Sequence, residues 1–186
     1  DVPIMQANLA EAPLWHTPAA EGKQVILTLP LPDGRMERFR IFEAPVMHPD
    51  LQALYPDIRS YAGVGIDDPA AYFRGDFTPK GFHGMVRSPN HSTVYIDPYS
   101  IADLVNYQVY FRKDFTKEEA RECQLGETGL EQKPAPIDPD KMAGDCQLRT
   151  YRLALACTGE YAAFHGGTVP LVAAAMVTTM TRVNGV

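Results

Sequence analysis

The sequence lacks a hydrophobic run long enough to span a lipid bilayer. A transmembrane helix needs about 20 consecutive apolar residues, and the apolar stretch at 169–177 is too short and lies within an amphipathic pattern. The first residues, Asp1-Val-Pro, also lack the basic-then-apolar pattern of a signal peptide. We therefore expect no membrane-spanning segment and an internal or already processed start.

Positive charge is also scarce. The 17 Lys and Arg residues are outnumbered by 23 Asp and Glu residues, which gives a formal net charge of -6 at pH 7. Nucleic acids and anionic membranes bind basic surfaces, so we expect neither as a partner. The hydrophobic content of 45% and the charged content of 22% are those of an ordinary globular protein.

Cysteine is rare, with only Cys123, Cys146 and Cys157. An odd number leaves at least one thiol that is free or paired with a part of the protein outside this sequence. Cys157 ends an apolar stretch and is predicted to be a core residue, because free cysteine is among the most often buried residue types.

The familiar catalytic motifs are missing as well. No two of the five histidines have the i, i+4 spacing that places two imidazoles on one metal ion. There is no Gly-x-Ser-x-Gly elbow, and Gly63-Val-Gly65 precedes no predicted helix that would hold a phosphate. A hydrolase acting through Ser and His within 58–100 therefore has no spacing signal to support it.

Three histidines lie in turn or strand contexts. His83 and His91 flank a predicted hairpin and could approach one another, or they could be two unrelated surface or turn residues. His165 lies beside Gly166-Gly167 and is predicted to be a structural or hydrogen-bonding residue.

The first half of the chain has the pattern of antiparallel strands. The stretches 23–29 and 35–42 flank Leu31-Pro-Asp-Gly34, where Pro presets φ and Gly takes the left-handed position, so a β-hairpin is predicted. Further short strands, separated by turn residues, are predicted at 58–66, 71–78, 81–87, 93–96 and 107–111. This spacing predicts an antiparallel sandwich or rolled sheet.

Two other segments complete this half. Residues 49–55 are predicted to form a short helix with Leu51, Leu54 and Tyr55 facing inward. Residues 1–22 are predicted to be irregular, with at most one short edge strand.

The composition changes between 116 and 145. Residues 117–122 are a charged run, and the prolines of 134–140 permit no regular element. With so few hydrophobic residues to bury, this stretch is predicted to be an exposed linker that a protease would cut first.

The last part of the chain has a different pattern. Residues 148–157 are apolar or small on both faces, which predicts a strand buried in a helix-covered sheet. Residues 169–183 predict a helix that Thr168 can cap and in which Pro170 lies in the first turn. The apolar stripe of that helix comprises Val169, Val172, Met176, Met180 and Val183.

The same stretch carries a family resemblance. The segments that carry it are Leu148-Arg-Thr-Tyr-Arg-Leu-Ala-Leu-Ala, Thr158-Gly-Glu-Tyr, Phe164-His-Gly-Gly-Thr168 and Met180-Thr-Arg-Val-Asn-Gly-Val186. They resemble the beginning of the catalytic domain of secreted, reprolysin-like zinc metalloproteases. The resemblance extends more loosely upstream, to the pro-segment of the family's bacterial members.

The resemblance implies an α+β chain of three parts. Residues 1–115 would be a β-rich antiparallel pro-segment domain, 116–146 a linker, and 147–186 an incomplete, metzincin-like α/β strand-helix unit. In the complete protein it implies a secreted zinc endopeptidase that acts on peptide or protein substrates.

The family's zinc motif, His-Glu-x-x-His followed by a third His, is absent from this sequence. We therefore expect this chain to bind no catalytic zinc, to contain no catalytic residue and to be inactive. The alternative is a non-enzymatic β-rich module, in which 1–115 acts alone as a folding aid, an inhibitor or an interaction domain.

Two of the cysteines fall in the predicted linker. In a latent zinc protease, a pro-segment thiolate can occupy the open coordination position of the metal. Cys123 and Cys146 are the candidates for such a thiolate, and Cys123 has the greater reach. They could instead form a disulfide that closes a loop of about two dozen residues, or neither role could apply.

The strand-helix unit at 148–186 requires a surface for its apolar stripe. We expect it either to dock back onto the β-rich half or to pair with a second copy of the chain.

Overall fold

The computed structural model describes residues 2–101, 103–116 and 151–186. Residues 1–116 and 157–186 form one compact unit, and residues 117–156 belong to a second one. None of the described helices is both long and apolar enough to cross a membrane.

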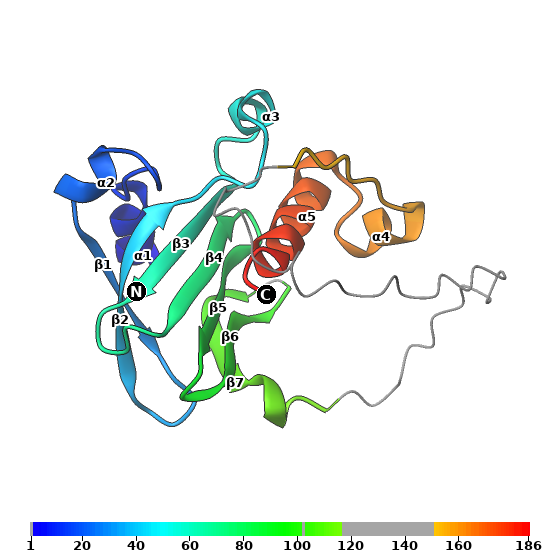
Figure 1. The fold of residues 1–186 in the computed structure, drawn as a ribbon. Coiled ribbons are helices and arrows are strands. Elements are labelled where there is room, and N and C mark those ends of the chain that lie inside the picture. Colours follow the sequence, from blue (N-terminus) through cyan, green and yellow to red (C-terminus); the bar gives the residue numbers. More distant parts are fainter. Residues whose placement is uncertain (1, 102, 117–150) are drawn as a thin grey trace, which may run out of the picture. The chain divides into compact units, whose positions relative to one another are not determined.

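Seven strands form one antiparallel sheet, in which each strand pairs with the next one along the chain. Figure 1 shows this sheet curled into a half-barrel, with helices from the N-terminal and C-terminal parts of the chain beside it. The predicted antiparallel, α+β fold is therefore confirmed. The strands are β1 (Val25–Pro30), β2 (Met36–Glu43), β3 (Arg59–Gly65), β4 (Tyr72–Thr78), β5 (Gly81–Ser88), β6 (His91–Ser100) and β7 (Asp103–Phe111).

The predicted first hairpin is confirmed. Val25 pairs with Ile41, and Pro30 pairs with Met36. Gly34 has a φ of 86°, the left-handed conformation that glycine adopts without steric cost. Its N–H donates to the carbonyl of Leu31 at 3.0 Å, which closes the turn.

The inner face of the half-barrel is an apolar core. Phe39, Phe73 and Phe82 are fully buried there, with ring centroids 6.1 Å apart for each neighbouring pair. Burial of each such side chain contributes roughly 1.5–3 kcal/mol. Both edge strands, β1 and β7, add side chains to the same core, and the sheet must curl for them to do so.

The N-terminal residues differ from the sequence-based prediction. In place of an irregular lead-in, helix α1 (Val2–Ala10) packs along β1 and buries Leu9 in the core. Its nine residues carry no clear amphipathic pattern, so its tertiary contacts decide its conformation. A single turn, α2 (Ala19–Gly22), follows, and Leu14 forms the only edge bridge of this region within the described residues.

Helix α3 (Pro49–Leu54) forms where the sequence predicts a helix. The two leucines that were predicted to face inward do not do so. Leu54 is 71% exposed and Leu51 is also exposed, whereas Tyr55 packs against Ile58 and Val177. The helix projects from the sheet in Figure 1. A helix of fewer than two turns buries little of its surface, so its leucines stay in solvent.

Two helices lie within residues 157–186. Helix α5 (Val169–Val183) has the predicted bounds, although the side chain of Thr168 makes no capping hydrogen bond. A second helix, α4 (Gly159–Phe164), was not predicted, and Thr158 caps it. Gly166 and Gly167 have φ values of 103° and 70° and form the turn between the two helices.

The predicted strand at 148–157 is wrong for the residues that the structure describes. Residues 151–157 have no regular secondary structure, and 148–150 lie outside the described residues. Tyr151 is 82% exposed, and Leu153 and Leu155 are exposed too. Cys157, predicted to lie in the core, is an exposed free thiol. An alternating apolar pattern gives strand propensity, but a strand also needs a hydrogen-bonding neighbour, and none pairs with 151–157 among the described residues.

Candidate functional site

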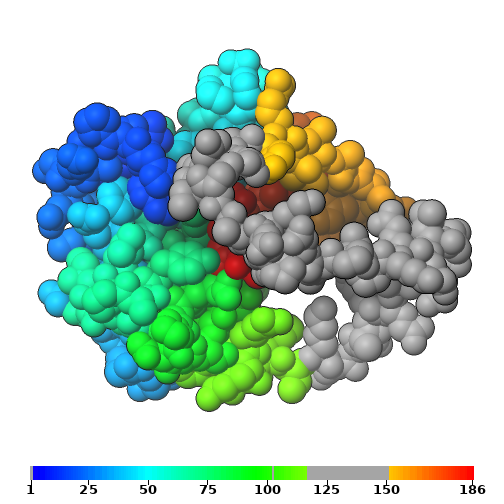
Figure 2. Space-filling view, in the orientation of Figure 1, coloured from blue at the N-terminus to red at the C-terminus, as the bar shows by residue number. Residues whose placement is uncertain are grey.

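The outer face of the sheet is polar where a helix covers it. Along β4 and β5, Phe73 and Phe82 point into the core, so Arg74, Asp76 and His83 lie on the opposite face. Helix α5 packs across this face, against β3 and β4. We call the outer side of β3–β6 that contacts α5 the helix-binding face. In Figure 2, red atoms of the chain's C-terminal part lie directly against the green atoms of the sheet.

Helix α5 turns small side chains toward the sheet. Ala174, Val177 and Thr181 are buried, which lets the helix backbone approach the strands closely. The two ends of the predicted stripe lie outside this contact, because Val169 and Val183 are 69% and 55% exposed. The remaining stripe residues, Val172, Met176 and Met180, are half-buried.

Asp76 lies at the centre of the helix-binding face and is only 1% exposed. Its Oδ1 accepts a hydrogen bond from Thr178 Oγ1 of α5 at 2.8 Å and lies 3.1 Å from His83 Nδ1. Its Oδ2 has no hydrogen-bond partner among the described residues. Burial raises the pKa of the Asp76 carboxyl above its ordinary value, although the contacts with His83 and Thr178 act in the opposite direction.

A second polar contact joins α5 to β6 and β7. Arg182 of α5 donates to Asp97 Oδ1, and its guanidinium lies 5.1 Å from the centre of the Tyr95 ring. Asp97 Oδ2 also accepts a hydrogen bond from Tyr110 at 2.9 Å. Burial, followed by the charge of Asp97, raises the pKa of Tyr110, so the phenol remains a donor at neutral pH.

The sheet also holds the carbonyl groups that follow α5. Arg87 Nη1 donates to the carbonyls of Gly185 at 3.0 Å and Val186 at 2.7 Å, and the Tyr72 hydroxyl donates to Gly185 as well. These donors hold the two residues that follow the C-cap of α5 against the sheet. A Cβ on Gly185 would lie 2.0 Å from Met85 Cε, so a side chain there would force the end of the Met85 side chain to move.

The turn before α5 is anchored too. Lys80 Nζ lies 3.3 Å from His165 Nδ1 and donates to the carbonyl of His165 at 3.5 Å. Burial and the neighbouring Lys80 charge lower the pKa of His165. The prediction that His165 is a structural, hydrogen-bonding residue is therefore confirmed.

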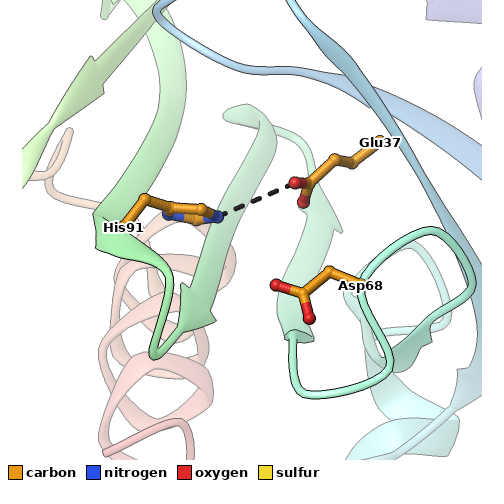
Figure 3. A group of neighbouring side chains, drawn as sticks. All are labelled: Glu37, Asp68 and His91. Atoms are coloured by element: carbon orange, nitrogen blue, oxygen red, sulfur yellow. Dashed lines mark ion pairs between the residues drawn. The ribbon is translucent and has the colours of Figure 1, made fainter.

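A separate polar group lies at the rim of the half-barrel. Glu37 of β2, Asp68 of the β3–β4 loop and His91 of β6 point toward one another (Figure 3). One ligand atom from each lies within 4.8 Å of the others. The group lines an open pocket of about 440 Å³, to which Arg35, Asp67 and Asn90 also contribute.

The structure also gives contacts for most of the other histidines and serines that the sequence analysis considered. His83 lies next to Asp76, and His91 lies next to Glu37. Each histidine therefore contacts a different carboxylate, and the two do not form one site. Ser60 donates to the carbonyl of Ala44, and Ser88 donates to Asp68. Neither serine donates to a histidine within the described residues. Cys123 and Cys146, the latency-thiolate candidates, lie outside the described residues.

The cluster of Glu37, Asp68 and His91 was not predicted from the sequence, although one signal for it was present. Glu37 has the same alternation phase as Phe39 and Ile41 on its strand, which places a carboxylate on the core face. Asp68 and His91 carry no such signal, because loop geometry brings them to Glu37.

Comparisons of the chain with protein-family models, with curated proteins and with solved structures found no match. The function must therefore be argued from the chain's own residues.

Proposed function

We propose that the chain is part of a secreted zinc metalloendopeptidase precursor. In this proposal, residues 1–115 are the pro-segment, and its helix-binding face holds the first helix of the catalytic domain, α5. The observation that carries the proposal is the seating of α5, which belongs to the stretch with the family resemblance, on a sheet built by the upstream residues.

The polarity of the contact supports a role in temporary binding. A permanent core consists mostly of apolar side chains, whereas interfaces that later separate are more polar. Here Asp76, Asp97 and Arg87 each contact α5 or the residues just after it. A surface of this kind can position a helix while the rest of a domain folds and can release it at a later stage.

The described residues do not form the three-histidine zinc site that the resemblance implies. The only cluster of three or more metal-ligating side chains that they form contains a single histidine, His91, whereas the resemblance implies three histidines. We therefore derive no hydrolytic step from this chain and assign it the binding role alone.

A test of the proposal is to read the coding sequence beyond Val186. The proposal expects a His-Glu-x-x-His motif within the next few hundred codons, followed by a third histidine. A stop codon shortly after Val186 would contradict it.

One observation favours the alternative of a non-enzymatic module. The inner core is built from residues of α1 and its following loop and from β1–β7, with no side chain from α5. The β-rich half therefore has a core of its own and could act on a partner without a protease domain. The same reading-frame test separates the two proposals.

A further inference from the structure

We propose that Glu37, Asp68 and His91 form a binding site for one divalent transition-metal ion, and that Zn²⁺ is the ion it takes. This site is separate from the helix-binding face and does not depend on the proposed protease function. Figure 3 shows the three side chains converging from three segments of the half-barrel rim.

The first argument is burial without partners. Glu37 is 7% exposed, and its Oε2 has no hydrogen-bond partner among the described residues; the same is true of His91 Nε2. A buried carboxylate without compensation is strongly unfavourable, so such groups are paired or coordinate a metal. The nearby arginines are already engaged, because Arg35 pairs with Asp33 and Arg38 pairs with Asp67.

The second argument is the orientation of the imidazole. His91 Nδ1 lies 2.9 Å from the carbonyl of Ser92, and a carbonyl can only accept, so Nδ1 carries the hydrogen. In the neutral ring, Nε2 then presents its lone pair toward Glu37 Oε1, 3.9 Å away. That distance is too long for a hydrogen bond. It suits two ligands of one ion, because atoms that each lie about 2.0–2.2 Å from Zn²⁺ are roughly 3–4 Å apart.

The third argument is that the third ligand is held in place. Asp68 Oδ2 accepts hydrogen bonds from Ser88 Oγ at 2.6 Å and Asn90 Nδ2 at 2.9 Å, and Oδ1 accepts from the N–H of Ala70 at 3.0 Å. Supporting contacts of this kind orient metal ligands, and each carboxylate oxygen keeps lone-pair capacity for an ion.

The ligand set selects the ion. Ca²⁺ and Mg²⁺ prefer all-oxygen coordination, whereas an imidazole combined with carboxylates suits Zn²⁺ and its neighbours in the transition series. Three protein ligands leave a fourth position for water, which the open pocket can supply. Bound there, the ion would tie β2, the β3–β4 loop and β6 together.

The test is Zn²⁺ binding by the full chain after chelator treatment and dialysis. Because thiolates also bind Zn²⁺, all measurements use a background in which Cys123, Cys146 and Cys157 are replaced by serine. We expect one Zn²⁺ per chain by elemental analysis and a single saturable isotherm by calorimetry. Ca²⁺ and Mg²⁺ should not compete.

Matched variants locate the ion. Glu37→Gln and His91→Gln should each weaken binding by more than about 100-fold, and Ser88→Ala, which removes only a support of Asp68, by about 10–100-fold. His83→Gln should leave binding unchanged. If a ligand variant fails to fold, as judged by circular dichroism, Ser88→Ala still tests the site.

Two results would overturn the proposal. One is saturable Zn²⁺ binding that neither Glu37→Gln nor Ser88→Ala weakens, because the ion then lies elsewhere. The other is an absence of saturable Zn²⁺ binding by the folded full chain.

Discussion

At the scale of single residues, the burial of Asp76 has a consequence for stability. Its pKa is raised in the folded chain above the ordinary value of 3.8, with burial as the first cause. The folded state therefore binds the proton more tightly than the unfolded state does. The contribution of Asp76 to the free energy of unfolding is most favourable at low pH, and it declines as the pH rises from about 4 through the raised pKa.

We expect Asp76→Asn to remove this decline. The free energy of unfolding, measured by urea denaturation at several pH values from 4 to 8, should fall with pH more steeply in the original chain than in the variant. Asp57→Asn, at an exposed position, is the matched control and should keep the original slope. Equal slopes for the original chain and Asp76→Asn would mean that Asp76 is not held in the buried state described here.

At the scale of elements, the feature to test is which face of α5 lies against the sheet. Ala174 is fully buried, whereas Val169 on the predicted stripe is exposed. Replacing Ala174 with Leu inserts a large side chain into the buried contact with Ile58, and such overpacking typically costs about 1–3 kcal/mol.

We therefore expect Ala174→Leu to lower the free energy of unfolding by about that amount. Val169→Leu, on the same helix, should change it by less than about 0.5 kcal/mol. Both values come from urea denaturation monitored by circular dichroism. If Val169→Leu proves the more damaging, the predicted stripe faces the sheet after all.

Local patterns suffice to predict most of the elements but not how each one packs. The hairpin at Gly34, the later strands of the sheet and the bounds of α5 follow from turn residues, alternation and capping signals. Helix α1 could not be predicted, because only its contact with the core makes it helical. The strand at 148–157 has the right alternation, but no hydrogen-bonding neighbour pairs with its described part.

The same limit applies to the two polar regions. Asp76 and Arg182 lie more than a hundred positions apart in the sequence, and only the docking of α5 brings their surroundings together. Glu37 was recognisable as a charge on an apolar strand face. Its partners Asp68 and His91 come from a loop and a strand start, whose position depends on the curl of the sheet.

At the scale of the whole molecule, the predicted linker at 116–146 would join the two parts of the proposed precursor. Limited proteolysis should cut first between 116 and 145, because that composition predicts accessible backbone. The β-rich half should resist longer, since its core is continuous from α1 to β7. Degradation of the β-rich half before the linker would place the boundary elsewhere.

The seating of α5 on the helix-binding face is the central claim, and the cut chain tests it most directly. After linker cleavage, native size-exclusion chromatography at several concentrations reports whether the fragment containing α5 stays with the β-rich half. We predict that the two fragments elute together, that Ala174→Leu separates them, and that Val169→Leu does not. Separation of the unmodified fragments while the β-rich half remains folded would contradict the account.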